Sequence, residues 1–104
     1  MKRLLITMTL AGLASSSALA ATPQDILTKG GCLACHAVDK KIVGPSYKQV
    51  AVKYKGDAGA EAKLVAKVRK GGSGVWGPVP MPPHTPAQIS DADLKTVVDW
   101  ILKQ

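Results

Sequence analysis

The sequence predicts a small all-α domain of about four short helices that wrap around a cofactor. Apolar residues repeat at the three- and four-residue spacing of a helix in several segments, and residues that favour helix N-termini precede them. No stretch alternates apolar and polar residues as a half-buried strand would. The chain contains no phenylalanine, and a domain of this size is marginally stable unless a further group adds to its core.

Residues 1–20 have the pattern of a secretory signal peptide. Two basic residues are followed by a mostly apolar run, which is too short to span a membrane, and Ala18-Leu19-Ala20 matches a signal-peptidase site. We therefore expect cleavage after this site, a single domain over residues 21–104, and a location in the periplasm. A retained N-terminal anchor is the alternative.

The first helix is predicted to begin after Thr22, which is a favourable N-cap. Pro23 stands at the first helical position and Asp25 three residues after the cap. Gly30-Gly31 is expected to end this helix, because glycine readily adopts the conformations found after a helix C-terminus.

A second helix is predicted to start at Gly44-Pro45. Pro45 lacks an amide hydrogen, so it leaves no unpaired donor at a helix start. We expect residues 55–57 to close the helix. The residues with helical spacing on its apolar face are Tyr47, Val50, Ala51 and Tyr54.

Two more helices are predicted in the second half of the chain. One spans residues 60–70 and stops at the glycine-rich stretch 71–74. The other begins after Ser90, a good N-cap with Asp93 three residues later. We expect Trp100 to pack against the first helix. The apolar face of the last helix consists of Leu94, Val97, Val98 and Ile101.

Cys32-Leu33-Ala34-Cys35-His36 is the stretch that carries the chemistry. Two cysteines three residues apart, followed directly by histidine, match the C-x-x-C-H run through which c-type haem is attached covalently. Each thiol can bond to one haem vinyl group, and the adjacent imidazole can bind the iron. The motif predicts Cys32 and Cys35 as attachment points and His36 as a proximal iron ligand.

Three other roles for these cysteines fit the sequence less well. A thioredoxin-like redox pair needs a βαβ setting, which the sequence does not indicate. A zinc site could use Cys32, Cys35, His36 and His84, but structural zinc sites use spaced pairs of ligands. A disulfide between the two cysteines would close a very short loop and remove little chain entropy.

Met81 is the predicted second iron ligand. It is the only methionine after the predicted leader, and four of the six residues from 78 to 83 are prolines. Proline fixes φ and excludes helix, so this stretch should form a stiff, extended loop. Ligation by histidine and methionine would leave no open position on the iron and would favour the ferrous state. A core-filling role for Met81 and ligation by His84 instead are the alternatives.

The chain is basic, which is usually a solubility feature but can also favour an acidic protein partner. The formal net charge of +7 falls to +5 when Lys2 and Arg3 leave with the leader. A basic surface can speed encounter with an acidic partner by electrostatic steering. The few aromatic residues are not interleaved with a basic stripe, so nothing indicates nucleic-acid binding.

Three stretches together resemble the small bacterial class I cytochromes c, the cytochrome c-551/c-552 family. They are residues 32–36, Val43-Gly44-Pro45-Ser46-Tyr47, and the run from Gly74 to Pro83 that contains Trp76 and Met81. The likeness extends from about residue 26 to residue 103. It implies the class I cytochrome c fold around one covalently attached haem.

The resemblance also implies roles for individual residues. Cys32 and Cys35 would form the thioether bonds, and His36 and Met81 would be the axial ligands. The carbonyl of Pro45 would accept a hydrogen bond from the other ring nitrogen of His36. Similarity to the family gives a further expected role, in which the indole N–H of Trp76 donates to a haem propionate, with simple core packing as the alternative.

The function that the resemblance implies is electron transfer rather than catalysis. It implies a soluble, monomeric one-electron shuttle, with a quinol-oxidising complex or similar donor and a nitrite reductase or terminal oxidase as acceptor. A haem enzyme or a gas-binding sensor with a displaceable sixth ligand is the alternative, since either would need an open position on the iron.

Overall fold

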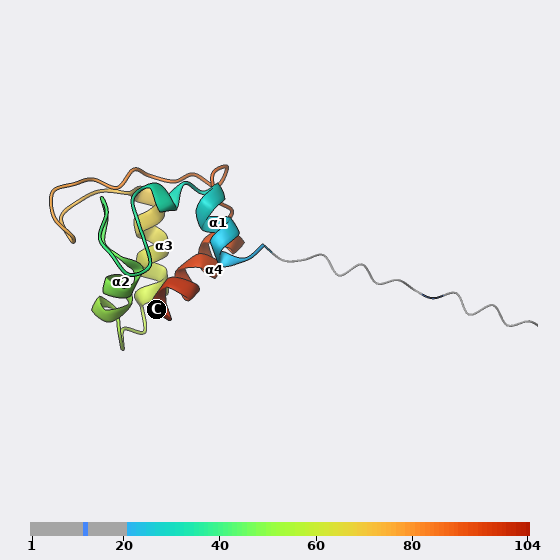
Figure 1. Ribbon diagram of the computed structural model, residues 1–104, viewed down its shortest axis with the longest axis horizontal. Coiled ribbons are helices and arrows are strands. Elements are labelled where there is room, and N and C mark those ends of the chain that lie inside the picture. Colours follow the sequence, from blue (N-terminus) through green and yellow to red (C-terminus); the bar gives the residue numbers. More distant parts are fainter. Residues whose placement is uncertain (1–11, 13–20) are drawn as a thin grey trace, which may run out of the picture.

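The computed structural model describes residue 12 and residues 21–104, so the predicted leader lies almost entirely outside the described residues. Within the described part, the chain forms helices and no β-strand, which confirms the all-α prediction (Figure 1). Of these helices, none has both the length and the apolar character needed to cross a membrane. The helices are α1 (Pro23–Lys29), the 3-10 helix η1 (Cys32–Ala34), α2 (Tyr47–Lys53), α3 (Ala60–Lys70) and α4 (Asp91–Leu102).

Helix α1 begins as the sequence predicts. The Thr22 side chain accepts a hydrogen bond from the Asp25 backbone N–H, and the Asp25 carboxylate accepts one from the Thr22 N–H. This reciprocal pair satisfies two donors that a helix N-terminus would otherwise leave unpaired. Ile26 and Leu27 form the buried face of the helix.

Helix α2 starts two residues later than the predicted Gly44-Pro45. Ser46 is its N-cap: the Ser46 hydroxyl accepts from the Gln49 N–H at 3.1 Å, and the Gln49 side chain accepts from the Ser46 N–H at 3.0 Å. Pro45 thus lies outside the helix, because this Ser-x-x-Gln capping box sets the boundary. The predicted third helix agrees with α3 over residues 60–70.

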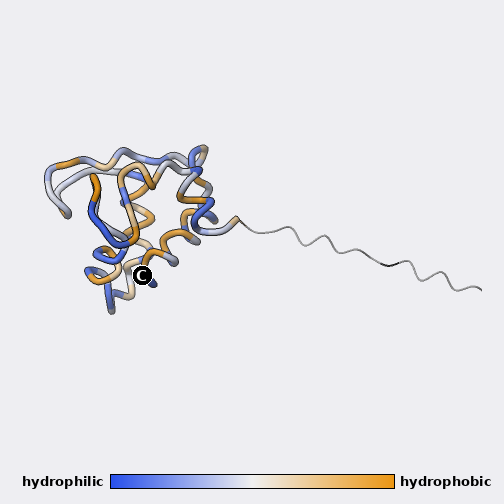
Figure 2. The backbone as a smooth tube through the Cα atoms, viewed as in Figure 1, coloured by the Kyte–Doolittle hydropathy of each residue, from blue (hydrophilic) through white to orange (hydrophobic). Residues whose placement is uncertain are grey.

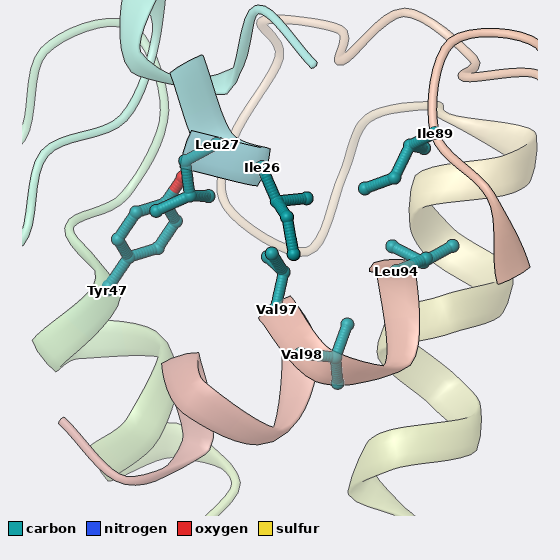
Figure 3. Close-up of a cluster of buried hydrophobic side chains, with 7 residues drawn as sticks. All are labelled: Ile26, Leu27, Tyr47, Ile89, Leu94, Val97 and Val98. Atoms are coloured by element: carbon teal, nitrogen blue, oxygen red, sulfur yellow. The ribbon is translucent and has the colours of Figure 1, made fainter. Parts of the chain in front are cut away.

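Helix α4 forms the base on which the other helices pack. It contacts α1, α2 and α3, and Figure 3 shows side chains from α1 and α2 meeting those of α4. Apolar and polar residues are interspersed along the helices (Figure 2), as expected for helices with one buried face. The buried cluster consists of Ile26, Leu27, Tyr47, Ile89, Leu94, Val97 and Val98.

Trp100 has an aromatic partner that the sequence did not indicate. Its ring meets Tyr47 of α2 edge-on, with ring centroids 5.9 Å apart and planes at 80°. The prediction placed the indole against α1, and Trp100 does pack beside the cluster that includes Ile26 and Leu27. The specific ring contact is nevertheless with α2, an arrangement that aromatic pairs favour.

Candidate functional site

An apolar cavity lies between the turn at η1 and the long segment that joins α3 to α4. The turn contributes Cys32, Cys35 and His36 to its wall, and the segment contributes Met81. Helices α3 and α4 supply a mostly aliphatic floor, which comprises Leu64, Val68, Leu94, Val97, Val98 and Ile101. The two predicted haem attachment residues and the two predicted iron ligands therefore border one cavity.

The turn at η1 is closed by its own backbone. The N–H groups of Cys35 and His36 both donate to the carbonyl of Cys32, at 3.2 and 3.0 Å. Gly31 precedes the turn with φ of 74°, a left-handed conformation that glycine adopts without strain. Both thiols are free, and burial raises the pKa of the Cys32 thiol.

The imidazole of His36 is held in one tautomer. Its Nδ1 lies 2.8 Å from the carbonyl oxygen of Pro45. A carbonyl only accepts, so Nδ1 carries the proton and donates. The Nε2 atom is then left with a lone pair, which is the form in which histidine binds a metal.

The ring of His36 is also confined by Gly44 and Tyr47, two residues that were not predicted to contact it. A Cβ at Gly44 would lie within 3.0 Å of three of its ring atoms. The phenol ring of Tyr47 stacks on the imidazole. Burial of Tyr47 raises the pKa of its hydroxyl. The Val43-Gly44-Pro45-Ser46-Tyr47 run was the available signal, because it places both residues beside Pro45.

Met81 lies in a segment fixed at two points. The backbone of Met81 and that of Gly72 exchange two N–H to carbonyl hydrogen bonds, each 2.9 Å long. Three residues later, the His84 N–H donates to the carbonyl of Val68 at 3.0 Å. At Gly71, with φ of 66°, a Cβ would collide with the backbone of residues 81–83. The proline-rich stretch is thus an extended segment held against the end of α3.

His84 and Trp76, the other two candidate residues, also border the cavity. The Nδ1 atom of His84 lies 2.9 Å from the Pro82 carbonyl. Trp76 is 38% exposed, and the ammonium group of Lys53 lies 5.5 Å from the centroid of its ring, within the range of a cation–π contact. Lys53 was not identified from the sequence, since nothing local links the two residues.

The cavity and its side chains fit a porphyrin with an iron at its centre. Two free thiols three residues apart, an imidazole with an available Nε2 and a thioether surround a largely aliphatic space. Among the described residues, no group of three or more histidine, cysteine or acidic side chains is arranged to hold a metal ion by itself. An all-α domain with this set of donors has the features of a c-type haem protein.

Comparison with known proteins gives the family. The cytochrome c family model matches residues 20–104. The chain is 57% identical over 83 residues to cytochrome c2 of Rubrivivax gelatinosus, an alignment that covers 80% of this chain and 98% of that protein. It is 47% identical over 92 residues to cytochrome c-551 of Pseudomonas aeruginosa, covering 88% and 86%.

The fold agrees with the sequence comparison. The crystal structure of Nitrosomonas europaea cytochrome c552 superposes with a TM-score of 0.70 at 46% identity, over 77% of this chain and 96% of that one. The chain therefore belongs to the cytochrome c family, with the class I fold. It is an electron-transfer haem protein with one covalently bound c-type haem, and the predicted resemblance to the c-551/c-552 proteins is confirmed.

Proposed function

We propose that this protein is a soluble periplasmic electron carrier in which His36 and Met81 would be the two protein ligands of the haem iron. The observation that carries the proposal is that both side chains border one apolar cavity while hydrogen bonds hold their backbones. When bound, the haem supplies a one-electron couple between Fe(II) and Fe(III). With both positions filled by the protein, substrate has no place to bind the iron, so the protein is a carrier and not an enzyme.

Each residue of the site has a separate task in this proposal. Cys32 and Cys35 form the covalent attachments. The hydrogen bond from His36 Nδ1 to the Pro45 carbonyl keeps the ring oriented with Nε2 toward the iron. The stiff segment around Met81 presents its thioether with little further ordering, which supports a bond weaker than that of imidazole. The indole N–H of Trp76 donates to a propionate.

Met81 is favoured over His84 as the second ligand by the local contacts. Both the N–H and the carbonyl of Met81 are hydrogen-bonded to Gly72. A thioether also leaves the ferrous state favoured, which suits a carrier that accepts electrons readily.

The proposed setting follows from the sequence. Residues 1–20 act as a signal peptide that is removed, which places the mature domain of residues 21–104 in the periplasm as a monomer. Its partners are then a quinol-oxidising complex or similar donor and a nitrite reductase or terminal oxidase. The excess of basic residues suits an acidic docking surface on at least one of them.

The visible spectrum of the purified holoprotein tests the ligand assignment. We expect a sharp α-band in the reduced protein and the weak far-red band of an iron–methionine bond in the oxidised protein. Rapid binding of carbon monoxide or cyanide at neutral pH would instead indicate an open iron, and with it a haem enzyme or gas sensor. The intact mass should equal one haem plus a chain that begins near residue 21, and a mass that includes the leader would contradict the proposed cleavage.

A further inference from the structure

The side chain of Arg69, in the last turn of α3, donates three hydrogen bonds to the segment that leads into α4. Its Nη1 donates to the carbonyls of His84 and Ile89, at 3.3 and 2.9 Å. Its Nη2 donates to the carboxylate of Asp91. The Arg69 side chain is only 19% exposed. One guanidinium thus holds residues 84–91, the part of the chain that follows Met81.

Both the N–H and the carbonyl of His84 form hydrogen bonds to the last turns of α3. Its N–H donates to the carbonyl of Val68, and its carbonyl accepts from the side chain of Arg69. Val68 and Arg69 are neighbours in the helix. Figure 1 shows the segment running outward from the end of α3 and back past it toward α4, so this contact is made where the segment returns.

Only two residues separate His84 from Met81, and both are prolines. Proline fixes φ and has no N–H, so the stretch from Met81 to His84 has few torsions that can absorb a displacement. The backbone of Met81 itself is hydrogen-bonded to Gly72. The position of the Met81 backbone is therefore set by two anchors, the Gly72 pair and the His84 backbone.

We propose that Arg69 is a positioning residue for Met81. By holding the His84 and Ile89 carbonyls against α3, it keeps the rigid stretch in the place from which Met81 closes one face of the cavity. Without Arg69, a larger fraction of molecules has Met81 away from the iron. This inference rests on the proposed ligation by His36 and Met81.

The two carbonyl contacts carry the effect, rather than the ion pair. The side chain of Asp91 is 89% exposed. Ion pairs at exposed positions contribute little to stability because water screens them. The His84 and Ile89 contacts are part-buried, so water replaces a lost donor less readily there than at an exposed ion pair. Asp91→Asn should therefore leave the position of Met81 unchanged.

The test measures imidazole binding to the ferric holoprotein. The variant is Arg69→Gln, and Lys70→Gln is the matched control, because Lys70 is the next residue of α3, is exposed, and loses the same charge. We expect imidazole to bind Arg69→Gln about tenfold more tightly than it binds the unaltered protein, the order expected from losing a hydrogen bond to a charged group. Lys70→Gln and Asp91→Asn should behave like the unaltered protein. The far-red band should weaken in Arg69→Gln alone.

Unfolding by guanidinium chloride on the same samples separates positioning from general stability. If Arg69→Gln unfolds more easily but binds imidazole as the control does, Arg69 only stabilises the fold and the inference is wrong. If Arg69→Gln does not fold, Arg69→Met carries the test by the same criterion, since the methionine side chain keeps an unbranched apolar stem but has no N–H to donate to either carbonyl. If the unaltered protein itself lacks the far-red band, the proposed Met81 ligation fails first and the inference fails with it.

Discussion

The imidazole of His36 lies nearly parallel to the phenol ring of Tyr47, with centroids 5.3 Å apart and planes at 20°. Tyr47 is 3% exposed and also meets Trp100 edge-on. It therefore links the histidine of the site to the helix on which the whole core is built.

Replacing Tyr47 should weaken the fold substantially. Tyr47→Ala is expected to lower the free energy of unfolding by about 3 to 5 kcal/mol, as for other large aromatic residues truncated in a core. Tyr47→Phe keeps both ring contacts, so its cost should be much smaller. Guanidinium unfolding of the holoproteins measures both values. An equal loss in the two variants would mean that the hydroxyl, and not the ring, is what matters.

A side chain at Gly44 should disturb His36 directly. The Cβ of Gly44→Ala would lie within 3.0 Å of three atoms of the imidazole, and overpacking of this kind costs about 1 to 3 kcal/mol. We expect a lower unfolding free energy and shifted resonances of the His36 ring in NMR spectra. Gly59→Ala is the control, because its Cβ would make only ordinary contacts. Unchanged His36 resonances in Gly44→Ala would show that the ring can move aside.

Removal of the Met81 side chain should open the iron. Met81→Ala is expected to lose the far-red band and to bind cyanide or imidazole in the ferric state. Its reduction potential should fall by a substantial part of the roughly 0.8 V range that axial ligands set, since methionine favours ferrous iron. His84→Ala should keep the band. Survival of the band in Met81→Ala, with its loss in His84→Ala, would identify histidine as the ligand.

The pH dependence of stability should report the contact between Asp57 and Lys63. The Lys63 ammonium, 2.7 Å from the Asp57 carboxylate, and the Gly59 N–H hold the pKa of Asp57 below its ordinary value. A carboxyl whose pKa is lowered on folding stabilises the protein above its unfolded pKa and loses that contribution as the pH falls through the folded value.

Asp57→Asn should consequently be less stable than the unaltered protein at pH 7. The difference should shrink as the pH falls below about 4, the range in which an unfolded aspartate takes up its proton. Unfolding curves at several pH values measure it, and the effect should be small because the pair is exposed. A difference that stays constant down to pH 2 would show that charge is not its cause.

Local sequence signals were sufficient to predict most helix boundaries. Thr22 with Asp25, and Ser90 before α4, are caps whose partners lie within three residues, so the sequence contains both members of each pair. The start of α2 differs from the prediction because the capping box of Ser46 and Gln49, and not Pro45, sets the boundary. Both members of that pair lie within three residues, so this boundary too has a local sequence signal.

Contacts between distant segments could not be predicted in this way. The contacts of Arg69 have no sequence signature, because its acceptors are backbone carbonyls 15 and 20 residues away. The stacking of Tyr47 on His36 likewise depends on the path of the chain between them. The sequence could identify the candidate ligands, while the groups that hold them in place required the structure.

The position of α4 in the chain has a consequence for how the protein matures. The helices α1, α2 and α3 all pack on α4, which follows them in the sequence, so a growing chain cannot complete its hydrophobic cluster before α4 has been made. The thiols of Cys32 and Cys35 are synthesised about 60 residues earlier. A chain that ends before α4 would therefore carry both thiols but lack Leu94, Val97 and Val98 from the floor of the cavity.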